Sequence, residues 1–185
     1  QPYESWFDIV QFYANHHADI LDIGCGTGTL TCMLSDLGNV SGMDISPDML
    51  SIASQKSNQI NWLEGDMTNF QLDHQFDIVT IFCDSLNYLP TLDNVEDTFK
   101  CVYNHLKDNG LLIFDVHTVA KMTTLFSDQS YIDEAEHLFL GWDALKGAEP
   151  LSVIHQMSFF IERENGLYQR FDEEHYQRTF EKDVY

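Results

Sequence analysis

The chain has 185 residues, of which 44% are hydrophobic, and this is enough for one domain with a packed core. Thirty acidic residues stand against nine lysines and arginines, which gives a formal charge of -21. A field of this sign repels phosphate backbones, so composition argues against a large nucleic-acid-binding surface. No apolar run approaches the roughly 18 residues of a membrane span, and the first residues lack the basic start and apolar stretch of a signal peptide.

The four cysteines form no CxxC pair and show no metal-ligand spacing. They are Cys25, Cys32, Cys83 and Cys101. We therefore expect free thiols in a reducing, cytoplasmic compartment, and no metal site.

Helical and strand patterns alternate along the first two thirds of the chain. Helices are expected at residues 3–17, 29–37, 47–57 and 92–106, and strands at 20–23, 40–44, 60–64, 76–82 and 111–116. Gly38 is placed to be the left-handed cap of the second helix, and Ser46 with Pro47 to begin the third. Strands that alternate with helices through short links predict an α/β fold with a doubly wound, mostly parallel sheet.

After Val116 the pattern changes. We expect a helix at residues 118–126 and a loop rich in acids and aromatics as far as Pro150. Two strands, 151–163 and 167–180, then flank Asn165-Gly166, a pair typical of a type I′ turn. This antiparallel β-hairpin region is appended to the sheet domain, and residues 181–185 resemble the first turn of a truncated helix.

The first strand runs into three glycines at alternate positions, Gly24, Gly26 and Gly28. A loop without side chains lets a ligand approach the backbone, and the helix that follows offers free N–H groups. Asp44 ends the second strand, twenty positions after Gly24, which suits a carboxylate that binds ribose hydroxyls. Asp66 ends the third strand at the same edge of the sheet. These features indicate a site for a nucleotide-like ligand.

The glycine spacing distinguishes two kinds of nucleotide site. A dinucleotide fingerprint is GxGxxG, whereas Gly24–Gly28 reads GxGxG, with its third glycine one position early. This argues against a nicotinamide-dependent oxidoreductase. Taken alone, the three glycines also fit a plain tight turn at a strand end.

The ordered motifs resemble the class I S-adenosylmethionine-dependent methyltransferases. Ile20–Gly28 is similar to that family's first motif, Gly42–Leu50 to the second, and Gly65–Met67 to the third. Residues 76–89 and 106–115 resemble its fourth motif and the strand that follows. The resemblance covers about residues 3 to 118.

The resemblance implies S-adenosylmethionine as cofactor, with S-adenosylhomocysteine as product, and it implies roles position by position. Gly24 and Gly26, with Cys25 between them, would lie beside the methionine moiety. The other implied cofactor-binding residues are Asp22 (the loop or the amino group), Asp44 (ribose), Ile45 and Met67 (the two sides of the adenine), Asp66 (the adenine amino group), the Cys83 carbonyl (the methionine ammonium), and Tyr3 and Trp6 (closing the pocket).

Several of these residues have a purely structural alternative. Ile45 and Met67 fit core positions, Asp22 fits a loop-capping acid, and Tyr3 and Trp6 fit packing residues. His117, after the fifth strand, is the best-placed candidate for a general base, and it also fits a packing or substrate-contact residue. Asp84–Tyr88 differs from the Pro-Pro-Tyr motif used on the amino groups of nucleic-acid bases.

The sequence therefore predicts a methyl-donor-binding domain over residues 1–117 and a lid or substrate-binding appendage over 118–180, with 181–185 as the start of the truncated helix. Tyr131, Trp142, His155 and His175 are candidates to line the appendage, or ordinary residues of a half-exposed sheet. The last helix and two strands of the family fold lie outside this sequence. We expect an uncovered outer strand and hence a possible homo-oligomer.

The predicted function is in-line transfer of a methyl group to a small-molecule acceptor, without membrane association. Three alternatives stay open at this point. They are a non-catalytic S-adenosylmethionine-binding regulatory module, an RNA methyltransferase that needs a basic partner, and the nicotinamide-dependent oxidoreductase.

Overall fold

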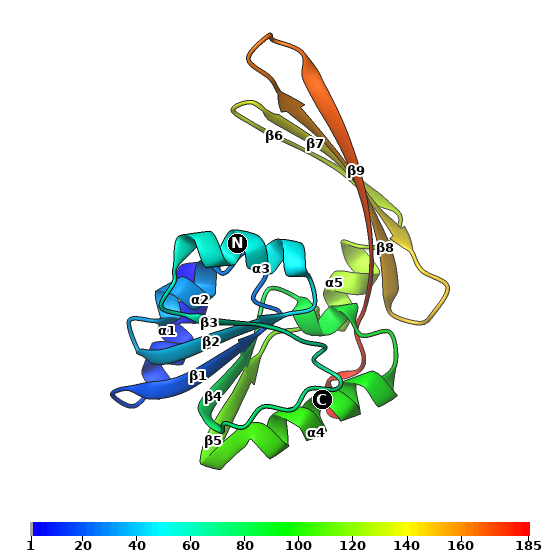
Figure 1. Cartoon of the computed structure of the whole chain (residues 1–185). Coiled ribbons are helices and arrows are strands. Elements are labelled where there is room, and N and C mark those ends of the chain that lie inside the picture. The colour runs from blue at the N-terminus through cyan, green and yellow to red at the C-terminus, as the bar shows by residue number, and fades with distance from the viewer. Residues whose placement is uncertain (1) are drawn as a thin grey trace. The chain divides into compact units, whose positions relative to one another are not determined.

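The structure, a computed structural model, describes residues 2–185. The chain divides into two compact units (Figure 1). Residues 2–86 and 91–116 form the first, and residues 87–90 and 117–185 form the second.

The first unit is a five-stranded parallel sheet with the order β3-β2-β1-β4-β5. Its strands are β1 (Ala18–Ile23), β2 (Gly38–Asp44), β3 (Asn61–Glu64), β4 (Phe76–Ile81) and β5 (Leu106–Phe114). Its helices are α1 (Tyr3–Tyr13), α2 (Thr29–Leu34), α3 (Pro47–Lys56) and α4 (Leu92–His105), and the short 3₁₀ helix η1 (Ser85–Tyr88) follows β4. The predicted doubly wound parallel sheet is confirmed.

Strand order reverses between β1 and β4, because the chain first steps from β1 to β2 and β3 and then returns to β4. Right-handed crossovers therefore place α2 and α4 on opposite faces of the sheet. The carboxyl ends of β1 and β4 lie next to each other at this switch point, which is where open α/β sheets bind ligands. The sheet and its helices are seen in Figure 1.

One face of the sheet forms an apolar core with α1 and α2. The fully packed members of this core are Val10, Ala18, Ile20, Leu30, Leu34, Val40, Ile78 and Phe82. The predicted start of α3 is confirmed, since the Ser46 hydroxyl accepts a hydrogen bond from the Met49 amide at 3.3 Å and Pro47 is the first helical residue.

Several local predictions in this unit are wrong, including the start of β5, which lies at Leu106 rather than at Leu111. The first helix ends at Tyr13 rather than near His17. Gly38 is the first residue of β2 instead of a left-handed cap, and α2 ends earlier, at Leu34. The glycine is needed there for close packing, because a Cβ at position 38 would lie 2.1 Å from the carbonyl oxygen of Ala18 on β1.

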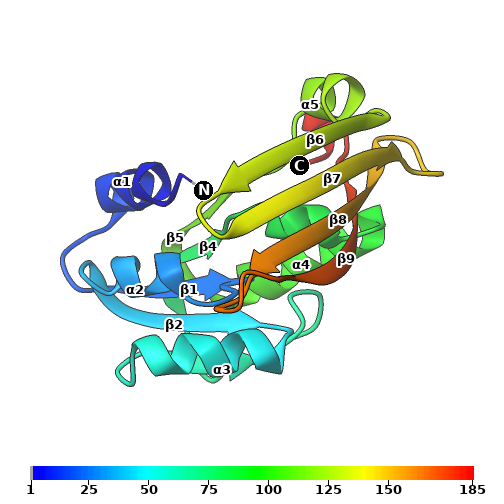
Figure 2. The same ribbon diagram turned by 90° about the horizontal axis from the view of Figure 1, so that it is seen from above.

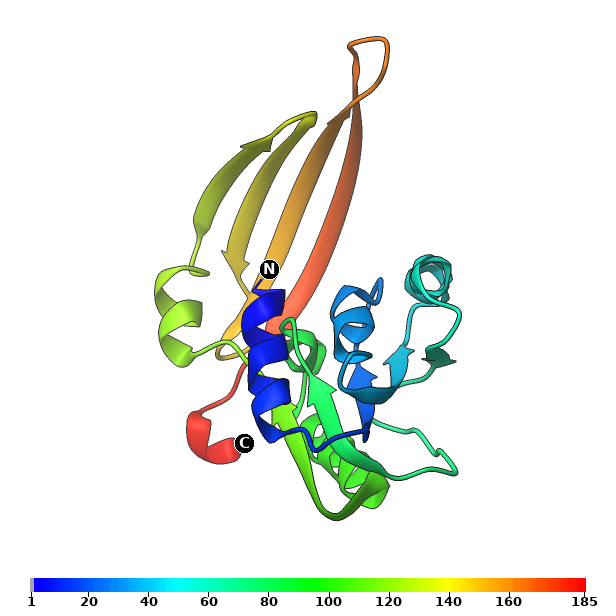
Figure 3. The same ribbon diagram turned by 90° about the vertical axis from the view of Figure 1, so that its left-hand side faces the viewer.

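The second unit is an antiparallel sheet of four strands in the order β6-β7-β8-β9. Its elements are α5 (Val119–Thr124), β6 (Gln129–Ala135), β7 (Leu138–Lys146), β8 (Ser152–Glu162), β9 (Tyr168–Arg178) and the 3₁₀ helix η2 (Lys182–Val184). Figure 2 shows the four strands side by side, and Figure 3 shows their length and twist.

The loop predicted between α5 and Pro150 is wrong, because this stretch forms β6 and β7. These strands meet at a tight connection through Glu136 and His137, and His137 has left-handed backbone, with φ 65°. Neither residue is a usual turn residue, so turn chemistry predicts no hairpin at this point. The appended region is therefore a complete small sheet.

The hairpin of β8 and β9 is confirmed, but its turn type is wrong. A type I′ turn needs positive φ at both central residues, and only Gly166 has it, at 74°. The Gly166 amide donates to the Arg163 carbonyl at 2.8 Å, and the Arg163 amide donates to the Leu167 carbonyl at 2.8 Å. The connection is thus a turn over Glu164 and Asn165 followed by a left-handed glycine.

The described part of the chain, residues 2–185, contains no helix that is both long and apolar enough to cross a membrane. Within the same residues, β5 pairs with β4 alone.

Candidate functional site

The glycine loop leaves the carboxyl end of β1 with all three glycines in left-handed backbone, at φ values of 69°, 54° and 75° for Gly24, Gly26 and Gly28. Other residues are strained there, and glycine is not. The amides of Gly24 and Cys25 both donate to the Met43 carbonyl of β2, at 2.7 and 3.1 Å. A Cβ on Gly26 would meet no atom within 4 Å. The loop is therefore anchored at its start and open at Gly26.

Asp44, at the end of β2, holds this loop from the neighbouring strand. One carboxylate oxygen accepts a hydrogen bond from the Gly26 amide at 2.7 Å, and the other accepts from the Ser46 amide at 2.9 Å. A carboxylate has about four acceptor positions, so capacity remains for hydroxyl donors. The predicted neighbourhood of Asp44 and the glycine loop is thus present in the structure.

Asp22 is buried beneath the loop, with 3% of its surface exposed. Its two carboxylate oxygens accept hydrogen bonds from the Thr31 hydroxyl at 2.6 Å and the Thr80 hydroxyl at 2.8 Å. Burial raises the pKa of the Asp22 carboxyl to about 6, and these two hydrogen bonds oppose that rise. Asp22 therefore ties β1 to α2 and to β4.

Ile45 and Asp66 stand at the same edge with exposed side chains. Ile45 is 67% exposed, unusual for an isoleucine that would serve as core. Asp66 accepts hydrogen bonds from the amide and hydroxyl of Thr68, both at 2.8 Å. The Met67 methyl group lies 3.9 Å from the position that a Cβ on Gly24 would take. Met67 is thus near Gly24, and Ile45 and Asp66 follow the carboxyl ends of β2 and β3.

The turn after β4 lies directly against the glycine loop. The Ser85 hydroxyl donates to the Phe82 carbonyl at 2.7 Å and approaches the Gly24 carbonyl at 3.3 Å. A Cβ on Gly24 would lie 2.5 Å from the Ser85 Oγ, so this contact requires glycine. Cys83, in this turn, has left-handed backbone with φ 61°.

Tyr3 and Trp6 lie on α1, where they pack against the core of the first unit. Their rings meet edge to face with centroids 5.9 Å apart, and Trp6 stacks on Phe82 at 5.7 Å. Burial raises the pKa of the Tyr3 hydroxyl, and the Cys83 thiol adds to this rise. Phe82 immediately precedes the Cys83 turn, so α1 is next to the end of β4.

The thiols of this region stay protonated. Burial raises the pKa of the Cys83 thiol to about 12 and raises that of Cys25 as well, and nearby carboxylates such as Asp22 add to both shifts. These thiols are therefore packing groups rather than nucleophiles. The described residues contain no cluster of His, Cys, Asp or Glu that could hold a metal ion.

All eleven predicted cofactor-site residues belong to the first unit. Three supporting residues were missed, namely Thr31, Thr80 and Ser85. Thr80 left a signal, since it is a polar residue inside the otherwise apolar β4, fully buried beside Asp22. Thr31 and Ser85 left none, because a hydroxyl in a helix or a loop is ordinary.

His117 belongs to the second unit, three residues beyond the end of β5. It is 3% exposed, and its Nε2 lies 2.9 Å from the Gln177 Oε1, which acts as acceptor. Its Nδ1 lies 3.1 Å from the Lys121 Nζ. Gln177 Oε1 also accepts from His155 Nε2 at 3.0 Å. His117 is thus one member of a buried polar chain.

The predicted aromatic residues of the appendage continue this chain. Trp142 Nε1 donates to His155 Nδ1 at 3.0 Å, and Tyr131 packs on Trp142 with centroids 4.9 Å apart. Burial lowers the pKa of His155 to about 4, so its ring is neutral. His175 lies opposite His155 across β8 and β9, with its Nδ1 3.2 Å from the Tyr88 hydroxyl.

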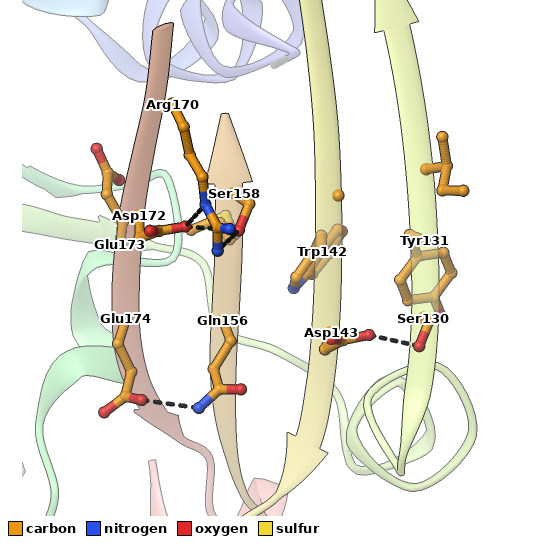
Figure 4. Close-up of a pocket in the computed structure, with 13 residues that line it drawn as sticks. Ser130, Tyr131, Trp142, Asp143, Gln156, Ser158, Arg170, Asp172, Glu173 and Glu174 are labelled. Atoms are coloured by element: carbon orange, nitrogen blue, oxygen red, sulfur yellow. Dashed lines mark hydrogen bonds and ion pairs between the residues drawn. The ribbon is translucent and has the colours of Figure 1, made fainter. Parts of the chain in front are cut away.

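A hollow of about 590 Å³ lies over the four strands of the second unit. Figure 4 shows polar pairs that cross it from strand to strand, such as Ser130 with Asp143 and Gln156 with Glu174. Ser158 and Arg170 both bond Asp172 there. None of the predicted cofactor-site residues lines this hollow.

Comparisons with known proteins agree on one family. Residues 20–110 match a family model described as a methyltransferase domain. The whole chain is 44% identical, over 190 residues and 76% of the relative, to the Bacillus subtilis (strain 168) protein named "Putative methyltransferase YqeM". An S-adenosylmethionine-dependent methyltransferase structure from Clostridium acetobutylicum ATCC 824 is similar at 30% identity and a TM-score of 0.88, over 100% of this chain and 77% of that one.

A more distant structure shares the fold. It is S-adenosylmethionine-bound CalS10, an amino pentose methyltransferase from Micromonospora echinaspora, at 20% identity and a TM-score of 0.80. The match covers 99% of this chain and 78% of that one.

Proposed function

Because this chain belongs to the class I S-adenosylmethionine-dependent methyltransferases, we propose that it methylates a small-molecule acceptor with the glycine loop and Asp44 as its cofactor site. The enzyme uses S-adenosylmethionine as methyl donor and releases S-adenosylhomocysteine. One observation carries the placement of the site. The Asp44 carboxylate accepts a hydrogen bond from the Gly26 amide at 2.7 Å, in the loop that leaves β1 at the switch point of the sheet. A Cβ on Gly26 would meet no atom within 4 Å, so the loop is open there.

The donor set fits the cofactor group by group. The loop backbone is open at Gly26, where a Cβ would meet no atom within 4 Å, and this open backbone suits the methionine moiety. The acceptor positions left on Asp44 suit the two ribose hydroxyls. Ile45, exposed beside Asp44, offers an apolar surface for one side of the adenine.

The remaining contacts surround this arrangement. We assign the adenine amino group to Asp66, with Met67 on the second side of the ring. The Cys83 carbonyl would accept from the methionine ammonium, and Tyr3 and Trp6 would close the pocket from α1. Asp22 would act indirectly, by holding β1 against α2 and β4, since both its carboxylate oxygens already accept hydrogen bonds from threonine hydroxyls.

The chemistry asked of the chain is modest, because the bound cofactor supplies an already activated methyl group on sulfur. The residues then serve to align the acceptor and to exclude water. A general base is needed only if the acceptor must lose a proton, and His117 is our candidate. Its two ring nitrogens are already near Gln177 and Lys121, so base function would need Lys121 to move from Nδ1.

A small-molecule acceptor is supported by the charge of -21, which disfavours nucleic acid. CalS10 is named as an amino pentose methyltransferase, and its fold is similar to that of this chain at a TM-score of 0.80. We therefore propose that residues 118–180 form the acceptor-selecting part.

The acceptor is found by incubating the chain with radiolabelled S-adenosylmethionine and a fractionated cell extract. Label in the small-molecule fraction supports the proposal. Label in RNA would show an RNA methyltransferase, and cofactor binding without label in any fraction would show a non-catalytic binding module. His117→Gln then tests the base, because its rate should fall while cofactor affinity stays constant.

Two further properties are proposed on composition and topology. We place the protein in the cytoplasm, since its four cysteines are free thiols. We propose that this stretch of 185 residues self-associates through the outer edge of β5, which pairs with no further strand among residues 2–185. Sedimentation that shows a monomer at high concentration contradicts this.

A further inference from the structure

The turn that follows β4 has an unusual backbone. Cys83 and Asp84 both have φ of 61°, which is left-handed, although neither is a glycine. Residues with a Cβ rarely adopt this conformation, and two in succession are rarer. Such a turn persists only when its surroundings hold it in place.

Two groups of contacts hold the turn from opposite sides. On one side, the Asp115 carboxylate accepts a hydrogen bond from the Asp84 amide at 3.1 Å, and the Asp115 amide donates to the Ile81 carbonyl at 3.2 Å. On the other side, Ser85 contacts Gly24, with its hydroxyl 3.3 Å from the Gly24 carbonyl. The turn therefore links the end of β5 to the glycine loop.

Ser85 packs closely against the backbone of Gly24. A Cβ on Gly24 would lie 2.5 Å from the Ser85 Oγ, so the two loops touch backbone to side chain. A relaxation of the Cys83–Asp84 backbone would move Ser85, the next residue, against the glycine loop. The geometry of the loop thus depends on the turn.

We propose that Asp115 is a positioning residue for cofactor binding. Its carboxylate holds the Asp84 amide, and thereby the left-handed turn, so that Ser85 keeps its place beside Gly24. This inference rests on the proposed cofactor site. It differs from a catalytic role, because Asp115 acts through the backbone of the turn.

The role of the hydrogen bond is separable from that of the charge. Asp115→Asn keeps an oxygen acceptor for the Asp84 amide and removes the negative charge, whereas Asp115→Ala removes both. Asp84→Gly removes the conformational penalty at one position, because glycine adopts positive φ freely. If Asp115 acts by holding the turn, Asp84→Gly should compensate for its loss.

The chain offers a matched control at the opposite edge of the sheet. The Asp77 carboxylate accepts a hydrogen bond from the Asp19 amide at 2.8 Å, which is also a carboxylate-to-amide bond between neighbouring strands. Both residues lie at the amino ends of their strands, away from the glycine loop. Asp77→Ala therefore removes a similar bond without touching the turn.

The first experiment is calorimetric titration with S-adenosylhomocysteine of the wild type and five variants. They are Asp115→Ala, Asp115→Asn, Asp84→Gly, the Asp84→Gly/Asp115→Ala double variant, and Asp77→Ala. We expect Asp115→Ala to lose about 10-fold in affinity, the effect of one hydrogen bond to a charged group. Asp115→Asn, Asp84→Gly and Asp77→Ala should stay within about 3-fold of wild type, and the double variant should recover most of the loss.

A second measurement does not depend on the cofactor. Hydrogen exchange of the Asp84 and Ser85 amides in the ligand-free protein should be about 10-fold faster in Asp115→Ala than in wild type. Unchanged exchange overturns the inference. So does equal loss of affinity in Asp115→Asn and Asp115→Ala, or a double variant that recovers nothing. If the wild type binds no S-adenosylhomocysteine, the proposed function fails, and the exchange data still decide whether Asp115 holds the turn.

Discussion

The Gly26 amide donates to the Asp44 carboxylate at 2.7 Å, across 18 positions of sequence. The bond joins the loop after β1 to the end of β2, so the carboxylate that would bind ribose also fixes the loop that would hold the methionine moiety. Because one residue does both, cofactor binding and loop geometry are coupled at Asp44.

Gly24 and Gly26 differ in the space around them, and alanine substitutions distinguish the two positions. Gly24→Ala should destabilise the fold by about 1–3 kcal/mol, because its φ is 69° and its Cβ would strike Ser85. Gly26→Ala should cost only about 1 kcal/mol, because its Cβ meets nothing within 4 Å. Denaturant unfolding measures both.

At Gly26, substitution by alanine should affect cofactor affinity more than it affects fold stability. The Cβ of Gly26→Ala projects into the space assigned to the cofactor, so affinity for S-adenosylhomocysteine should fall more than stability does. Gly141→Ala in β7 is the control, since its Cβ also meets nothing within 4 Å. Its stability and affinity should match wild type, and a Gly26→Ala variant with full affinity contradicts the placement of the site.

Asp22 predicts a pH dependence of stability. Its pKa is about 6 when folded against an ordinary value of 3.8, so between pH 4 and 6 the folded state binds more protons than the unfolded state. Its contribution to stability is present below pH 4 and is lost as pH rises through 6. The free energy of unfolding of wild type, minus that of Asp22→Asn, should therefore fall by up to about 3 kcal/mol as pH rises over this range. Chemical unfolding of both proteins between pH 4 and 7 measures this change.

His155 predicts the opposite sign. Burial lowers its pKa to about 4 from 6.5, so the unfolded state binds the proton first as pH falls. The stability contributed by neutral His155 is present above pH 6.5 and is lost as pH falls toward 4, by up to about 3 kcal/mol. Chemical unfolding of wild type and His155→Gln between pH 4 and 7 measures it, and a pH-independent difference contradicts it.

Lys107 offers a perturbation at the opposite edge of the parallel sheet. Its ammonium bonds Asp19 at 2.6 Å and Asp77 at 2.9 Å, and it is partly exposed. The bond from Lys107 lowers the pKa of Asp19. Lys107→Met should lower stability by at most about 1 kcal/mol, less at high salt, and leave cofactor affinity unchanged. Loss of affinity in this variant would contradict the location of the site.

Much of the first unit could be predicted from the sequence because its signals are local. Buried parallel strands are continuous apolar runs, and Ser46 with Pro47 marks a helix start by its own chemistry. The prediction that Gly38 caps a helix was wrong, because a glycine that ends a helix and a glycine that packs against Ala18 look alike in sequence. The difference lies in a contact 20 positions away.

The second unit was harder to predict for a physical reason. The turn at Glu136-His137 uses residues that do not mark turns, and β6 exposes most of its side chains. The hydrogen-bond partners of Asp22, and the bond between the Asp115 carboxylate and the Asp84 amide, could not be predicted from the sequence for another reason. Both depend on which strand ends meet, and strand order is set by the packing of the whole sheet.

The most direct test of the central claim is calorimetric titration of S-adenosylhomocysteine into wild type, Asp44→Asn and Asp44→Ala. We expect micromolar binding to wild type and a loss of about 10- to 100-fold in Asp44→Ala, because hydrogen bonds to both the cofactor and Gly26 are removed. Asp44→Asn should bind with intermediate affinity. Wild-type binding that Asp44→Ala leaves unchanged, or no binding to a folded wild type, would contradict it.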